Sequence, residues 1–143
     1  MKKLLFVILV LAVSCMAYAQ APAGGTLSVL FPPYSADLRA VDTDQAIANS
    51  QVFTQVARRL ADNPQLRVLI DGHANAVLGT NLEERQSLRP LSQRRAAAAA
   101  NFLVNYYNID RSRLIISGSG GGYPLSSSDG TVNRRVTFVI VTP

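Results

Sequence analysis

Few residues of this chain carry side chains that commonly do chemistry, and their spacing matches no catalytic or metal-binding motif. His73 is the only histidine and Cys15 the only cysteine, so neither has a partner at the spacing of a metal site. Ser119 lacks the glycine that a nucleophile elbow has two residues before its serine. Residues 118–122 lack the Gly-Lys-Ser/Thr ending of a phosphate-binding loop. We therefore predict that the protein is not an enzyme and holds no metal or cofactor.

A loop suited to reversible binding is the more informative polar feature. Gly72 to Asn75 follows the short apolar run 66–71, which predicts a strand. Loops at the ends of rigid strands are common places for binding residues. We therefore take this loop as the first candidate site.

The basic residues do not predict nucleic-acid binding. The formal net charge is +5, and Lys2 and Lys3 are the only lysines. The arginines are scattered and often stand near acids, whereas a nucleic-acid interface would gather them in a stripe with stacking aromatics. The charge pattern therefore excludes nucleic acid as the expected partner.

The N-terminal segment is predicted to be a secretory signal. Lys2 and Lys3 precede an apolar run from Leu4 to Val13, and small residues follow it. One reading removes residues 1–19 and leaves Gln20 as the new N-terminus. The alternative is a lipoprotein signal of residues 1–14 followed by a lipidated Cys15. In both readings residues 20–25 form a short linker and residues 26–143 form a single domain.

The folded part is predicted to alternate strands and helices. The hydrophobic pattern has strand character in four runs and helical character in two. In order these are a strand at 26–31, a helix at 44–62, a strand at 66–71, a helix at 92–107, and strands at 114–117 and 136–141. We expect Asp42 or Thr43 to cap the first helix and Ser92 to cap the second, whose inner stripe would end at Tyr106. This β-α-β-α-β-β order predicts an α/β sandwich (α+β), with both helices on one face of a mixed sheet.

Several short motifs together resemble those of a known family. They are Ile70-Asp71-Gly72-His73-Ala74-Asn75, Leu91-Ser92-Gln93-Arg94-Arg95-Ala96 and Asn133-Arg134-Arg135-Val136, with Gly118-Ser119-Gly120 and Pro124 before the last. In order and spacing they resemble the C-terminal domain family of OmpA, MotB and Pal. The resemblance runs from Thr26 to Val141. It implies a β/α sandwich that holds the diamino acid of the peptidoglycan stem peptide in a groove beside the second helix.

The resemblance also implies roles for individual residues. Arg95 matches the family arginine that faces a ligand carboxylate, to which a guanidinium can donate two parallel hydrogen bonds. Asn75 stands where the family has an aspartate facing the ligand's ammonium. The other groove residues that the resemblance implies are His73, Ala74, Leu91 and Arg134, with His73 in a mainly structural role.

The sequence departs from the family pattern on both sides of the predicted groove. Ala74 and Asn75 replace Thr-Asp, so a neutral amide takes the place of a carboxylate. Leu88 replaces an asparagine, and the longer loop before it carries Glu83 and Glu84. One hypothesis is that one of these acids supplies the missing charge. Another is that the stem peptide bears a different diamino acid.

These observations predict a periplasmic module that binds peptidoglycan without a covalent bond and associates with the outer membrane or the wall. It would anchor the envelope to the wall, and other envelope proteins are candidate partners. The alternative is a degenerate member of the family that has lost wall binding and serves as a protein-interaction subunit of an envelope complex.

Overall fold

The computed structural model describes residues 26–76 and 88–142, and within them it confirms the predicted order of elements. The elements are β1 (Leu27–Leu30), α1 (Thr43–Asp62), β2 (Arg67–Gly72), α3 (Arg89–Tyr107), the 3-10 turn η1 (Arg111–Arg113), β3 (Leu114–Gly118), α4 (Gly130–Asn133) and β4 (Arg135–Val141). The turn η1 and the short helix α4 are additions within connections. The predicted signal, Cys15, Glu83 and Glu84 lie outside the described residues.

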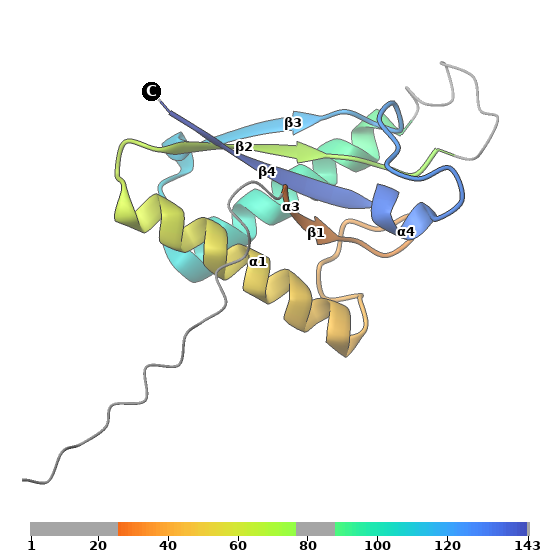
Figure 1. Ribbon diagram of the computed structural model, residues 1–143, viewed down its shortest axis with the longest axis horizontal. Coiled ribbons are helices and arrows are strands. Elements are labelled where there is room, and N and C mark those ends of the chain that lie inside the picture. The colour runs from red at the N-terminus through yellow and green to blue at the C-terminus, as the bar shows by residue number, and fades with distance from the viewer. Residues whose placement is uncertain (1–25, 77–87, 143) are drawn as a thin grey trace, which may run out of the picture.

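The four strands form one mixed sheet in the order β1-β4-β2-β3. β2 and β3 run parallel, while β4 is antiparallel to both β1 and β2. Helices α1 and α3 pack on the same face of this sheet (Figure 1). The predicted fold class is therefore confirmed. Because of the strand directions, the C-terminal ends of β1, β2 and β3 lie beside the N-terminal end of β4. These four strand ends form one end of the sheet, which we call the sheet edge.

The core lies between the sheet and the two helices. The side chains that fill it come from alternate strand positions and from one stripe of each helix. They include Val29, Val68, Ile70, Val136 and Phe138 from the sheet, Phe53, Val56 and Leu60 from α1, and Ala96, Ala99, Ala100 and Leu103 from α3. The small alanine side chains allow α3 to lie close to the strands. At the end of β2 the approach is closest, since a Cβ on Gly72 would lie 1.9 Å from the carbonyl oxygen of Ser92.

The first helix begins as predicted. The Asp42 side chain accepts a hydrogen bond of 2.8 Å from the backbone N–H of Gln45, which satisfies a first-turn amide. The second helix runs to Tyr107, but Tyr106 is 73% exposed and is not part of the inner stripe. Within residues 26–76 and 88–142, no helix is both long and apolar enough to cross a membrane.

The predicted cap of the second helix is wrong. α3 begins at Arg89, after Leu88, which makes no side-chain cap. Pro90 falls in the first turn, where a missing N–H leaves no helical bond broken. Ser92 is thus already inside the helix, where its hydroxyl donates to the carbonyl of Arg89 at 2.7 Å and accepts from the N–H of Gly120 at 2.9 Å. The serine ties α3 to the loop after β3 instead of starting the helix.

Candidate functional site

The sheet edge gathers the predicted site residues from three distant parts of the sequence. The backbone N–H of Phe31 donates to the carbonyl of Arg134, and that of His73 donates to the carbonyl of Arg135, each at 2.8 Å. The segments that follow β1 and β2 are therefore fastened to the start of β4 and the residue before it. Asn75 and Arg134 come to this edge, with Arg95 reaching it from the second turn of α3.

Arg95 lies on the helix side of the sheet and holds together two loops at the sheet edge. Its side chain is fully buried, and each guanidinium nitrogen donates to a backbone carbonyl. Nε bonds to Ser35 at 2.9 Å, Nη1 to His73 at 2.9 Å and Nη2 to Pro32 at 3.0 Å. The residue therefore fastens the loop after β1 to the loop after β2. Direct contact with a ligand carboxylate, as the sequence predicted, would require the Pro32–Ser35 loop to move.

The charge of Arg95 has no acidic counterpart in the described part of the chain. Burial, together with the positive charges of Arg134 and Arg94, lowers the pKa of Arg95 to about 10. The guanidinium carbon lies 5.6 Å from the centre of the Phe31 ring, a distance typical of a cation–π contact. Arg95 remains charged at neutral pH, and its field adds to that of Arg134.

The orientation of the Asn75 amide is fixed by Asn133. The side-chain oxygen of Asn133 accepts from the backbone N–H groups of Leu125 and Ser126, at 2.7 and 3.1 Å. Its Nδ2 must then face the other way, and it donates to the carbonyl of Ser126 and to Oδ1 of Asn75, at 2.7 and 2.9 Å. Asn75 therefore turns its oxygen toward Asn133 and keeps its Nδ2 donors for another partner.

Arg134 places a second guanidinium beside this amide. Its Nε donates to the carbonyl of Phe31 and its Nη2 to the hydroxyl of Thr131, both at 3.3 Å. Arg134 and Asn75 both approach Gly130. A Cβ on this glycine would be 2.7 Å from Nδ2 of Asn75 and 3.2 Å from Nη1 of Arg134. Both donor atoms therefore lie against the same glycine, within reach of one acceptor group, and a side chain at residue 130 would collide with the Asn75 amide.

The other predicted groove residues contribute mainly through their backbones or through packing. Ala74 is buried, and its N–H donates to the carbonyl of Gly120 at 2.8 Å. Leu91 is half-buried in the first turn of α3. Leu88 lies near Gly121, where its side chain and that of Ala76 leave no room for a Cβ. The position at which the family pattern has an asparagine is thus apolar in this protein.

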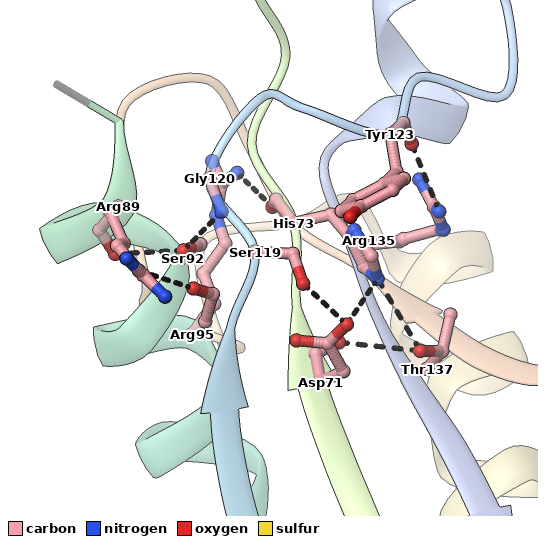
Figure 2. A network of polar contacts seen from close by, with 11 residues as sticks. Asp71, His73, Arg89, Ser92, Arg95, Ser119, Gly120, Tyr123, Arg135 and Thr137 are labelled. Atoms are coloured by element: carbon pink, nitrogen blue, oxygen red, sulfur yellow. Dashed lines mark hydrogen bonds and ion pairs between the residues drawn. The ribbon is translucent and has the colours of Figure 1, made fainter. Parts of the chain in front are cut away.

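His73 is oriented away from the helices. It lies in a polar cluster, shown in Figure 2, with Asp71, Ser119, Thr137 and Arg135. Thr137 alternates with core residues of β4, so this cluster occupies the sheet face that α1 and α3 leave free. Nε2 of His73 lies 3.3 Å from Oδ2 of Asp71 and 3.5 Å from the Thr137 hydroxyl. The hydroxyl of Ser119 donates to the same Oδ2 at 2.7 Å.

Burial lowers the pKa of His73, and the charge of Arg135 lowers that pKa further, while Asp71 opposes both effects. Nη2 of Arg135 donates to the carbonyl of Tyr123 at 3.3 Å. Four buried atoms in the cluster have no hydrogen-bond partner among the described residues: Oδ1 of Asp71, Nδ1 of His73, and Nε and Nη1 of Arg135. Among residues 26–76 and 88–142, no group of three His, Cys, Asp or Glu side chains could hold a metal ion.

Two residues that shape the site were not singled out from the sequence. Asn133 appeared only within the motif Asn133-Arg134-Arg135-Val136, although its amide orients Asn75. Gly130 had no predicted role, although a side chain at this position would collide with the Asn75 amide. The adjacent Asp129 could have indicated a helix beginning at Gly130, because aspartate is a common N-cap residue. Its side chain does accept a hydrogen bond from the backbone N–H of Thr131.

The sequence profile of the OmpA family matches residues 31–137, which is most of the chain. The protein belongs to the OmpA family. Its OmpA domain therefore includes all the site residues described above. The match also begins at Phe31, the residue where the loop held by Arg95 starts.

Known proteins of similar sequence and structure are consistent with this assignment. Outer membrane protein Omp38 of Acinetobacter baumannii is 32% identical over 93 residues, which are 63% of this chain and 25% of that protein. The chain thus matches only about a quarter of its relative's length. The peptidoglycan-associated lipoprotein of Burkholderia pseudomallei has a TM-score of 0.62 at 23% identity, covering 80% of this chain and 89% of that one. The OmpA-like domain of FopA1 from Francisella tularensis has a TM-score of 0.64 at 21% identity, covering 82% and 72%. These two structures share the fold.

Proposed function

We propose that this OmpA-family protein binds the stem peptide of peptidoglycan non-covalently in the periplasm and so links the envelope to the cell wall. The observation that carries the proposal is the family match over residues 31–137. The name of the Burkholderia lipoprotein states an association with peptidoglycan, and Omp38 is by its name an outer-membrane protein. We extend both properties to this chain as part of the proposal.

In this proposal the ligand meets the sheet edge at Asn75 and Arg134, beside Gly130. Arg134 is partly exposed, and its Nη1 has no hydrogen-bond partner among the described residues. Arg95 contributes charge from beneath and holds the Pro32–Ser35 loop in place. Glu83 and Glu84 as loop acids and Cys15 as a lipid attachment site remain predictions from the sequence.

Co-sedimentation with insoluble peptidoglycan tests the proposal. Wild-type protein should pellet with peptidoglycan from its own source, and Arg134→Gln should weaken binding by about tenfold, because a charge-assisted hydrogen bond is lost. Arg67→Gln is the matched control, since it removes an exposed arginine at the start of β2, at the opposite end of that strand. If the wild type stays in the supernatant, wall binding is rejected.

One observation favours the alternative of a protein-interaction subunit. Tyr123 and Leu125 are 70% and 67% exposed, and both belong to the loop that Asn133 fastens. Adjacent exposed apolar side chains are more typical of a protein interface than of a peptidoglycan groove. Under this alternative the wild type does not sediment with the wall, and Tyr123→Ser with Leu125→Ser abolishes association with an envelope protein while the fold is kept.

A further inference from the structure

The donors and acceptors at the sheet edge are unevenly distributed. Asn75 directs Nδ2 toward Gly130, because its oxygen accepts from Asn133. Arg134 approaches the same glycine with Nη1. Both polar side-chain atoms nearest to a Cβ at residue 130 are therefore hydrogen-bond donors. Such a site is complementary to an acceptor such as a carboxylate.

Charge leads to the same conclusion. Arg95 lies beneath the site and Arg134 beside it, and in residues 26–76 and 88–142 neither forms an ion pair with an acid. An ammonium group placed here would meet two like charges and an amide that turns its oxygen toward Asn133 and its NH2 group toward the ammonium. A carboxylate would meet two opposite charges, in a partly buried setting where Coulomb energies exceed those in bulk water.

We infer that this site selects a carboxylate of the stem peptide and does not require a neighbouring ammonium group. The inference rests on the proposed function and narrows its ligand class from a zwitterionic diamino acid to an anionic peptide group. The inference depends on the hydrogen bond from Asn133 to Asn75, which orients the Asn75 amide so that its NH2 group, a hydrogen-bond donor, faces the site. Asn75→Asp would reverse this, because a carboxylate can accept from Asn133 and still offer a second oxygen to an ammonium.

The test compares three forms of purified peptidoglycan in the same sedimentation assay: untreated, with its amines acetylated, and with its carboxylates amidated. Wild-type protein should bind the untreated and acetylated forms equally and the amidated form at least about tenfold more weakly. With Asn75→Asp, acetylation should weaken binding several-fold. Gly130→Ala should reduce binding to all three forms, because its Cβ would collide with the Asn75 amide and displace it.

Each outcome has a distinct meaning. If acetylation weakens wild-type binding, or if amidation leaves it unchanged, the inference is overturned while wall binding itself stands. If the untreated form is not bound, the proposed function fails. Non-specific attraction of a basic protein is monitored by Arg67→Gln, which removes one charge away from the site and should respond to the three forms as the wild type does.

Discussion

Arg95 and Arg135 are both buried near the same end of the sheet, but they lie on opposite faces of it. They also differ in how many of their guanidinium nitrogens form hydrogen bonds. Arg95 lies on the helix side, fully buried, with a carbonyl partner for each guanidinium nitrogen. Arg135 lies on the free face, 5% exposed, with a single bond of 3.3 Å and two nitrogens without a partner among the described residues. Both guanidinium groups are thus removed from water, but only that of Arg95 has a hydrogen-bond partner for every nitrogen.

This difference shows that burial alone does not make an arginine structural. A buried charge stabilises a fold only when its hydrogen bonds offset the loss of water, and a poorly compensated one is often replaceable by an apolar side chain. Arg95 meets that condition and Arg135 does not. The contribution of each residue to stability should therefore differ in size, and we expect a stabilising replacement only for Arg135.

Arg95→Met should give the largest loss of stability. It removes the donors of three backbone carbonyls, and hydrogen bonds to a charged group are each worth about 1.5 to 3 kcal/mol. We expect the free energy of unfolding to fall by at least about 3 kcal/mol, measured by urea denaturation. Arg95→Lys should recover only part of this, because one ammonium cannot match the planar fork of three nitrogens. Full recovery with lysine would show that charge alone is needed.

Asp71→Asn should have the second largest effect. It removes the negative charge that offsets Arg135 and lies beside His73. The expected loss is about 1 to 2 kcal/mol in the free energy of unfolding, because the hydrogen bond from Ser119 can be kept by the amide oxygen. An unchanged stability would mean that the charge of Asp71 is not coupled to its neighbours.

Arg135→Met should change stability by less than about 1 kcal/mol and could raise it. Its side chain loses one long hydrogen bond and no longer buries an underpaired charge. Combined with Asp71→Asn, it should reduce the loss seen for Asp71→Asn alone, which a double-mutant cycle measures. A loss as large as that of Arg95→Met would remove the distinction between the two arginines.

His73 should produce the smallest effect, visible only as a dependence on pH. Its pKa in the folded protein is lowered, so below the unfolded value of about 6.5 the unfolded chain binds more protons than the folded one. Its contribution to stability is therefore present above this pH and is lost as the pH falls from there toward the folded pKa. Denaturation from about pH 8 to about pH 5 should show a steeper decline for wild type than for His73→Gln.

The sequence predicted the elements well because their signals are local. Alternation and helical periodicity located all four strands and both long helices, and Asp42 marked the start of α1. The predicted cap at Ser92 was wrong, although serine is a common N-cap residue. The helix begins one turn earlier, at Arg89, with Leu88 before it and Pro90 in its first turn. The hydroxyl of Ser92 instead contacts Gly120, a residue far along the chain that no local pattern reveals.

The sequence predicted which residues to consider for the candidate site but not the contacts that they make. The motifs brought Asn75, Arg95 and Arg134 to attention, and the structure places them at one sheet edge. The sequence could not show that the three acceptors of Arg95 are backbone carbonyls, because carbonyl positions depend on the fold. Nor could it show that Asn133 fixes the amide of Asn75, since that contact joins residues 58 positions apart.

The position of β4 also constrains the order in which the protein can be assembled. β4 is the last strand in sequence yet lies between β1 and β2, and Leu27 is paired with Phe138. Until β4 joins the sheet, β1 has no strand to pair with, although β2, α3 and β3 can already associate. Formation of the complete sheet therefore requires Arg135–Val141, and until that strand is in place the backbone groups of β1 are open to pairing with other chains.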